Sequence, residues 1–187
     1  MADQGMLEEK WRIVFSLIDI NKDGVVSSAD AEFCKRTFGE MFADADKKAV
    51  AVADLDRYWD TLIFLGKTPD WSIEINGDKF VENFAEAFTA DKTGTQTSIS
   101  KALNHLLAAA DIDGTKVFTY EKFFKFHEAF NLANDVVVRT TFNLIGPDAN
   151  DACSLDQMHQ FYVELFVGEN VEKFNALKSA YKSVGML

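Results

Sequence analysis

Residues 19–30 concentrate the side chains most able to bind a metal ion. The stretch reads DINKDGVVSSAD and follows the apolar run WRIVFSLI. It holds three aspartates, an asparagine, two serines and a glycine within twelve residues. Calcium takes about six to eight oxygen ligands, and a glycine allows the sharp turn that wraps them around the ion. The chemistry indicated is the binding of a hard divalent cation.

The spacing of these residues matches a twelve-residue calcium loop between two helices. That pattern has ligands at positions 1, 3, 5, 7, 9 and 12 and a glycine at position 6. Gly24 takes position 6 when the loop starts at residue 19. The predicted ligands are Asp19, Asn21, Asp23, the carbonyl of Val25, Ser27 and Asp30.

Two features leave alternatives open for this loop. Position 12 is Asp30 rather than glutamate, and its shorter side chain favours a tighter octahedral site, so Mg²⁺ competes with Ca²⁺. Ser27 and Asp30 also fit the S-x-x-D capping box that starts a helix. A polar loop that only caps a helix is therefore the alternative to a metal site.

Residues 111–122 are a weaker version of the same pattern. With Phe118 at position 8, the candidate ligands are Asp111, Asp113, Thr115 and the carbonyl of Val117. Lys116 replaces the turn glycine, and position 12 is Lys122, a cation. Glu121 lies one residue earlier and would be the replacement ligand in a shortened loop. The expectation is a weak metal site at most, because the carboxylate at position 12 is missing.

The other two polar segments depart further from the pattern. Residues 68–79 (TPDWSIEINGDK) place Trp71 at position 4 and Lys79 at position 12. Residues 146–157 (GPDANDACSLDQ) place a glycine at position 1 and Asp151 where the turn glycine belongs. Neither segment is expected to hold a metal ion well.

Apolar residues recur with helical spacing on both sides of every polar segment. They predict helices over residues 7–17, 29–42, 49–65, 79–90, 99–110, 120–131, 136–145, 155–167 and 171–181. Each polar segment has an apolar residue just before the next helix, which should form a short β-bridge with the paired segment: Val26, Ile75, Phe118 and Cys153. The predicted fold is all-α, with four helix–loop–helix units in two pairs that form one compact globule.

A polar stretch divides the predicted units. Residues 91–98 (DKTGTQTS) are rich in serine, threonine and glycine and are predicted to be a linker. The division predicted from it is an N-terminal pair over residues 1–92 and a C-terminal pair with a final helix over residues 93–187.

Charge and composition narrow the partners and the compartment. The net charge of −11 argues against nucleic acid, which needs a basic surface. No apolar run reaches the roughly 20 residues that span a membrane, and the start MADQGMLEEKWR does not resemble a signal peptide. Cys34 and Cys153 fit no metal pattern and are expected to be buried free thiols of a cytoplasmic protein. A monomer without membrane or nucleic-acid partners is expected.

The aromatic residues allow a second kind of ligand. Phenylalanine occurs 17 times, and two groups repeat with helical spacing: Phe80, Phe84 and Phe88, and Phe123, Phe126 and Phe130. These side chains either pack a core or line a cavity for an apolar small molecule. Polar groups available to orient such a ligand are His105, His127, His159, Trp11, Trp59, Trp71 and Tyr181.

Other classes of function find little support. The sequence has no phosphate-binding glycine loop, nucleophile elbow or zinc spacing, so an enzyme is not expected. With five methionines it also lacks the methionine-rich groove of calcium sensors that grip target helices.

The layout resembles the sarcoplasmic calcium-binding protein group of EF-hand proteins, which includes luciferin-binding proteins and calcium-triggered photoproteins. The resemblance rests on DINKDGVVSSAD, on RYWDTL at residues 57–62, on a degenerate second loop and on a tail after FYVELFVGEN. It implies two EF-hand pairs in one globule that buffers Ca²⁺ and Mg²⁺ or holds an apolar luciferin. The expected function is an intracellular buffer that binds mainly through the first loop. The alternative is a carrier of an apolar small molecule in a central cavity, with mostly vestigial metal sites.

Overall fold

The computed structural model describes residues 4–185, and this part of the chain folds into nine helices and four very short strands. The helices are α1 (Gln4–Ile18), α2 (Ser28–Glu40), α3 (Ala45–Phe64), α4 (Gly77–Ala90), α5 (Lys92–Ala110), α6 (Tyr120–Glu128), α7 (Asp135–Ile145), α8 (Leu155–Val167) and α9 (Val171–Ser183). The strands are β1 (Val25–Val26), β2 (Ile75–Asn76), β3 (Val117–Thr119) and β4 (Ala152–Ser154). The all-α prediction is confirmed. None of the helices described is long and apolar enough to cross a bilayer.

The four strands join the loops in two pairs. β1 and β2 are antiparallel, with Val26 opposite Ile75, and β3 and β4 are antiparallel, with Phe118 opposite Cys153. All four residues are buried. These are the four predicted bridge positions, so the predicted pairing of helix–loop–helix units is confirmed.

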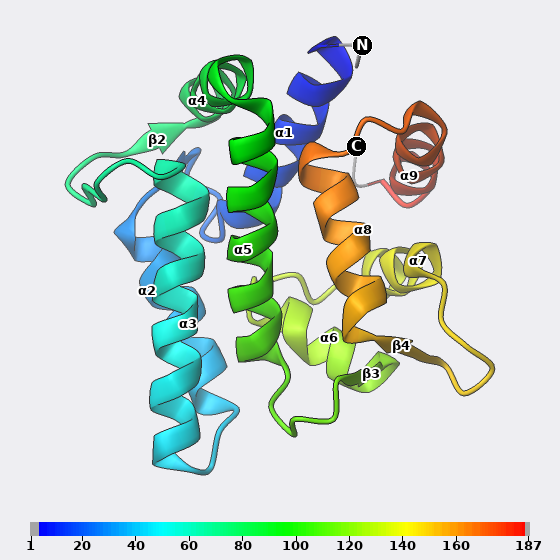
Figure 1. The fold of residues 1–187 in the computed structure, drawn as a ribbon. Helices are drawn as coiled ribbons and strands as arrows, with labels where there is room; N and C mark the ends of the chain where they lie inside the picture. The colour runs from blue at the N-terminus through cyan, green and yellow to red at the C-terminus, as the bar shows by residue number, and fades with distance from the viewer. Residues whose placement is uncertain (1–3, 186–187) are drawn as a thin grey trace.

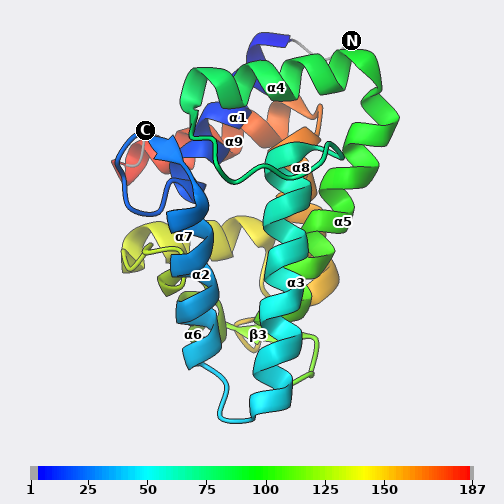
Figure 2. The same ribbon diagram turned by 90° about the vertical axis from the view of Figure 1, so that its left-hand side faces the viewer.

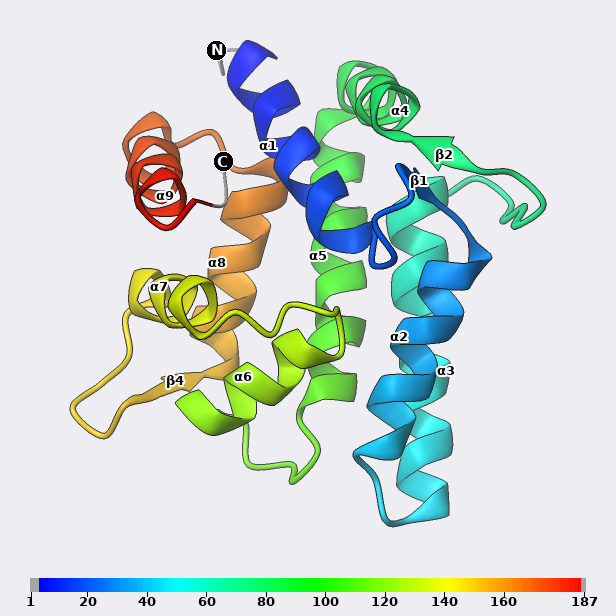
Figure 3. The ribbon, with the colours of Figure 1, turned by 180° about the vertical axis from the view of Figure 1, so that it is seen from behind.

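Helices from both halves of the chain share one core. α3, α5 and α8 lie side by side with α5 in the middle (Figures 1 and 3). Turned by a quarter, the molecule shows α4 lying across one end of α3 and α5 (Figure 2). α1 packs against both α4 and α8, which links the N-terminal pair to the C-terminal pair. The predicted single globule follows from these contacts.

The two phenylalanine stripes face this core, as predicted. Phe80 and Phe84 are buried with ring centroids 4.6 Å apart, and Trp11 lies 5.6 Å from Phe84. All three residues of the second stripe, at 123, 126 and 130, are buried, whereas Phe88 is only half-buried at the end of α4. Aromatic packing thus accounts for most of these side chains.

The predicted linker at residues 91–98 is wrong, because this stretch forms the first turns of α5. Asp91 caps the helix, and its carboxylate accepts a hydrogen bond of 2.9 Å from the amide of Gly94. Thr95 and Ile99 are buried against the core. An N-terminal cap and burial outweigh the low helix propensity of serine, threonine and glycine. The division of the chain at residues 92 and 93 falls in the first turn of this helix and stays a prediction.

Both cysteines are buried and free, as predicted. Burial raises the pKa of the Cys34 thiol to about 12 and that of Cys153 to about 11. Neither thiol is therefore activated as a thiolate near neutral pH.

Candidate metal centre

The first loop has the backbone shape that a calcium loop needs. Lys22 and Gly24, at positions 4 and 6, have φ angles of 59° and 90° in the left-handed region. Gly24 adopts this conformation at little cost because it lacks a Cβ atom. Its amide donates a 3.1 Å hydrogen bond to Oδ2 of Asp19, which closes the turn between positions 6 and 1. The backbone of the loop is thus closed on the carboxylate of its first residue.

In the first loop, the carboxylate of Asp19 gives the clearest indication of a metal site. The residue is only 6% exposed, and its Oδ1 is buried with no hydrogen-bond partner among the residues described. Burying a charged oxygen without a partner costs free energy, and a bound cation removes that cost. The burial of this oxygen therefore fits a cation at position 1 of the loop.

Asp30 is fully buried and ties the two ends of the loop together. Its Oδ1 accepts hydrogen bonds from the amides of Ile20 (2.8 Å) and Asn21 (3.3 Å). Its Oδ2 accepts one of 2.9 Å from the amide of Ser27, the N-cap of α2. The predicted capping box is present, and it holds the carboxylate at the base of the loop.

The predicted ligand side chains of the first loop do not surround a single point. Across residues 4–185, no three acidic, histidine or cysteine side chains converge as a metal-binding group. In the first loop, Asp23 is exposed, and the side-chain Nδ2 of Asn21 donates a 2.7 Å hydrogen bond to Oδ2 of Asp23. This side-chain contact must open before both residues can turn inward to an ion. The donor types, which are carboxylate, amide, hydroxyl and carbonyl oxygens, are those that Ca²⁺ and Mg²⁺ prefer.

The third loop brings its four predicted ligands together around a lysine. The ammonium Nζ of Lys122 lies near oxygens of Asp111 (2.7 Å), Asp113 (2.5 Å), Val117 (carbonyl, 3.1 Å) and Thr115 (3.5 Å). Glu121, the replacement ligand predicted for a shortened loop, lies away from these oxygens. That side chain is 80% exposed on the outer face of α6 and pairs with Lys125 at 2.9 Å. Helix geometry turns position 12 into the loop and position 11 away from it.

The fourth loop is closed by its twelfth residue. The side chain of Gln157 donates a 2.9 Å hydrogen bond to the carbonyl of Gly146 and accepts one of 2.9 Å from the amide of Ser154. Asp151, at the turn position, pairs with Arg139 at 2.7 Å. The polar groups of this loop are thus paired with each other or with α7.

The second loop turns its charged groups outward. Asp70 accepts hydrogen bonds from the amide and hydroxyl of Ser72, at 3.1 and 2.6 Å. Lys79, at position 12, pairs with Glu82 along the surface of α4. The loop contributes β2 to the pairing and no cluster of ligands.

A small apolar cavity lies between the two halves of the molecule. Its volume is about 60 Å³, and helices from both halves line it, including α3, α5, α6 and α8. Its polar lining groups are Tyr58, His127, Thr141, Tyr162 and Tyr181. Of the predicted ligand-orienting groups, His127 and Tyr181 reach it. Sequence reasoning missed Tyr162, although it follows the buried Met158 by four residues in α8.

His127 is neutral in this cavity, and its partners decide which nitrogen carries the proton. Nδ1 lies 2.9 Å from the carbonyl oxygen of Phe123, which can only accept, so Nδ1–H donates. Nε2 then accepts from the hydroxyl of Tyr162 at 3.3 Å. Burial lowers the pKa of His127 to about 4. The pair is a ready hydrogen-bonding group inside an apolar lining.

The other five predicted groups lie away from the cavity lining. Trp11 donates to the carbonyl of Phe166 at 2.9 Å, and Trp71 donates to Asp60 at 2.8 Å. His105 contacts Asp54, His159 contacts Ser100, and Trp59 is buried in the core. The first four make hydrogen bonds elsewhere, and the ring of Trp59 contributes to core packing.

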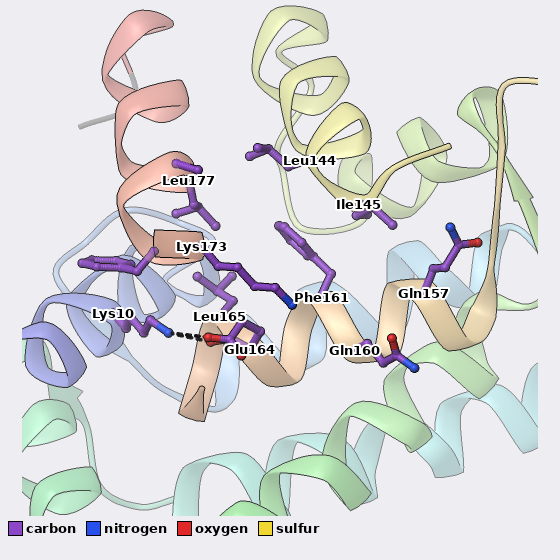
Figure 4. A pocket seen from close by; sticks show the side chains of 12 residues that line it. Lys10, Leu144, Ile145, Gln157, Gln160, Phe161, Glu164, Leu165, Lys173 and Leu177 are labelled. Carbon is purple, nitrogen blue, oxygen red and sulfur yellow. Dashed lines mark hydrogen bonds and ion pairs between the residues drawn. The ribbon is translucent and has the colours of Figure 1, made fainter. Parts of the chain in front are cut away.

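A larger cleft of about 230 Å³ lies between α7, α8 and α9 (Figure 4). Lys10 reaches it from α1 and is only 1% exposed, and burial lowers its pKa. Its ammonium donates 2.7 Å hydrogen bonds to the carbonyls of Glu164 and Gly168 at the end of α8. Lys10 therefore stabilises the C-terminus of α8 and ties α1 to it.

Comparison with known proteins identifies relatives of this chain. No family model matches the sequence. The sarcoplasmic calcium-binding protein of Mizuhopecten yessoensis is 30% identical over 178 residues, which cover 95% of this chain and 98% of that protein.

Solved structures share the fold at lower identity. The calcium-loaded apo form of the coelenterazine-binding protein from Renilla muelleri superposes with a TM-score of 0.69 at 18% identity, over 92% of this chain and 94% of that one. N-aequorin superposes with a TM-score of 0.69 at 13% identity, over 98% and 96% of the two chains. Taken with four helix–loop–helix units in two pairs, the full-length match at 30% identity shows that the chain belongs to the sarcoplasmic calcium-binding protein family of EF-hand proteins.

Proposed function

We propose that this protein binds one divalent cation in its first loop and acts as a buffer of that ion. The observation that carries the proposal is the buried, unpartnered Oδ1 of Asp19 within a loop of calcium-binding shape. The residues that would hold the ion are Asp19, Asn21, Asp23, the carbonyl of Val25, Ser27 and Asp30. Three carboxylates offset the ion's charge, and the backbone turn is already formed.

The ion is Ca²⁺, with Mg²⁺ as its competitor. Asp30 has a short side chain, and backbone amides already occupy both of its oxygens. Each oxygen keeps a further lone pair for a metal, but a bidentate contact is harder than from glutamate. If Asp30 binds the ion through one oxygen, the ion has a smaller coordination number. The affinities of the loop for Ca²⁺ and Mg²⁺ are then closer to each other.

Titration of the ¹⁵N-labelled protein with Ca²⁺ and with Mg²⁺ tests the proposal by NMR. Gly24, at position 6 of the first loop, and Gly114, at position 4 of the third loop, provide reporter amides for the two loops. We expect the amide of Gly24 to shift and saturate at one ion per chain, because it is bonded to the ligand Asp19. The amide of Gly114 should hardly move. Saturation of Gly114 with an unchanged Gly24 would contradict the assignment of the ion to the first loop.

A second candidate function is the carriage of an apolar, luciferin-like molecule. The observation that favours it is the His127–Tyr162 pair inside the central cavity. Its volume of about 60 Å³ is well below the roughly 300–1,000 Å³ of ligand pockets, so a ligand must expand it. The coelenterazine-binding protein from Renilla muelleri, which shares the fold, provides the chemical class of ligand to try.

Thermal denaturation with coelenterazine tests this carrier function. A carrier should melt at a higher temperature with the ligand, since the ligand binds only the folded chain. The shift should persist in Asp19→Asn, which lies outside the cavity, and shrink in Tyr162→Phe. If coelenterazine does not change the melting temperature, the carrier function is contradicted and the buffer function remains.

The site of action proposed is the cytoplasm, where the protein works as a monomer. Two buried free thiols suit a reducing compartment, which keeps cysteines unpaired.

A further inference from the structure

The third loop already contains a positive charge at its centre. The ammonium of Lys122 lies within 3.5 Å of four oxygens, two from carboxylates, one from a hydroxyl and one from a carbonyl. The lysine side chain is 13% exposed, and that of Asp111 is 10% exposed. The ring of Phe118, at position 8, lies 4.5 Å from the ammonium and adds a cation–π contact.

The four oxygens occupy the ligand positions of a calcium loop. They belong to positions 1, 3, 5 and 7, which in the first loop are Asp19, Asn21, Asp23 and Val25. The lysine comes from position 12, whose side chain normally turns back into the loop as the last ligand. Here the same turn delivers a cation instead of a carboxylate.

The backbone of the third loop has the same shape as that of the first. Gly114 and Lys116, at positions 4 and 6, have φ angles of 71° and 57°, as Lys22 and Gly24 have 59° and 90°. The amide of Lys116 donates to the Asp111 carboxylate at 3.1 Å, which repeats the contact of Gly24 with position 1. The loop keeps this shape although the glycine has moved from position 6 to position 4.

The ammonium of Lys122 offsets part of the negative charge of the two carboxylates in this loop. Asp111 and Asp113 would repel each other across an empty loop, and the ammonium attracts both. Together with hydrogen bonds from Thr115, it holds the pKa of Asp113 well below its usual range. A tethered cation needs no free ion in solution, so it is present at any calcium concentration.

We propose that Lys122 is the built-in cation of the third loop, a cation site that its own chain fills. The fourth loop is closed in a parallel way by Gln157, which spans positions 1 and 9. The strands of these two loops pair with each other. The C-terminal EF-hand pair therefore keeps an ion-loaded shape at all calcium concentrations, and only the first loop responds to metal.

Exchange of Lys122 for glutamate or methionine tests this proposal, with Lys125→Met as the matched control. Lys125 lies on the same helix but is exposed, and it pairs with Glu121 on the helix surface. In the absence of metal, we expect Lys122→Met to melt about 5–10 °C lower than the wild type, because it removes the ammonium that pairs with the buried carboxylate of Asp111. The control should melt within about 2 °C of the wild type.

Lys122→Glu should create a calcium site. It supplies the missing carboxylate at position 12, so calorimetric titration should count one more Ca²⁺ than in the wild type. The double variant Asp19→Asn, Lys122→Glu should bind one Ca²⁺ and shift Gly114 rather than Gly24 in the NMR spectrum. This outcome does not depend on metal binding by the first loop.

Two results would overturn the proposal. One is a Lys122→Met protein with the same melting temperature as the Lys125→Met control, because the ammonium would then not stabilise the folded chain. The other is a folded Lys122→Glu protein with the calcium count of the wild type, because the oxygens would then not form a cation site. A Lys122→Glu chain that folds only with Ca²⁺ would support it.

Discussion

Replacing Asp19 with asparagine should weaken calcium binding by at least about 100-fold, since loss of an outer-shell partner alone costs about 10–100-fold. Asparagine keeps the size of the side chain and can still accept the hydrogen bond from Gly24. It removes one of the three carboxylates of the loop. With that carboxylate goes the negative charge at Oδ1, which is buried without a hydrogen-bond partner. The metal-free variant should melt at or slightly above the wild-type temperature, because a buried unpaired charge is gone. Calorimetric titration with Ca²⁺ and thermal denaturation measure both effects.

Asp148→Asn is the matched control for that change. Asp148 lies in the fourth loop, where it accepts hydrogen bonds from backbone amides within the loop. Its replacement should leave calcium affinity unchanged. A loss of affinity in this control equal to that in Asp19→Asn would place the ion elsewhere than the first loop.

Acidification should destabilise the protein through His127. Its pKa is about 4 in the folded chain, because burial disfavours the imidazolium, against an ordinary value of 6.5. The unfolded chain therefore takes up a proton first, and stability falls as the pH drops from about 6.5 to about 4. The full contribution is about 3 kcal/mol. Between about pH 7.5 and pH 5 the wild type should lose roughly 2 kcal/mol of unfolding free energy through this residue.

Urea unfolding of the wild type and of His127→Gln at both pH values measures this contribution. The variant should lose roughly 2 kcal/mol less on acidification, because glutamine does not titrate. Equal pH dependence in the wild type and His127→Gln would contradict a buried neutral histidine.

Local patterns were enough to predict the elements and their pairing. Apolar spacing predicted the helices, and the bridge residues Val26, Ile75, Phe118 and Cys153 were found from their place in each loop. The stretch at residues 91–98 failed because propensity was judged without tertiary context. Asp91 as a cap and the burial of Thr95 made it helical.

The first loop was predictable because its twelve residues carry nearly all the information needed to shape it. What spacing does not show is how its side chains are used. Asp30 forms the predicted capping box, and it also ties the two ends of the loop together through the backbone amides of Ile20 and Asn21. The contact between Asn21 and Asp23 depends on rotamers, which a ligand count does not include.

Lys122 shows where a ligand count misleads. Sequence reasoning took it as the loss of a ligand, since a cation cannot bind a cation. The structure shows that a long side chain at position 12 reaches the centre of the loop and pairs with Asp111 and Asp113. The cavity pair of His127 and Tyr162 was hidden for a similar reason, because the two lie 35 residues apart in the chain.

Native mass spectrometry of the wild-type protein with saturating Ca²⁺ tests the central claim most directly, because it counts the ions held by each chain. One intact first loop, a third loop filled by Lys122 and a fourth closed by Gln157 predict a mass increase of one calcium ion. That increase should disappear in Asp19→Asn. Two or three ions on the wild-type chain would contradict the account.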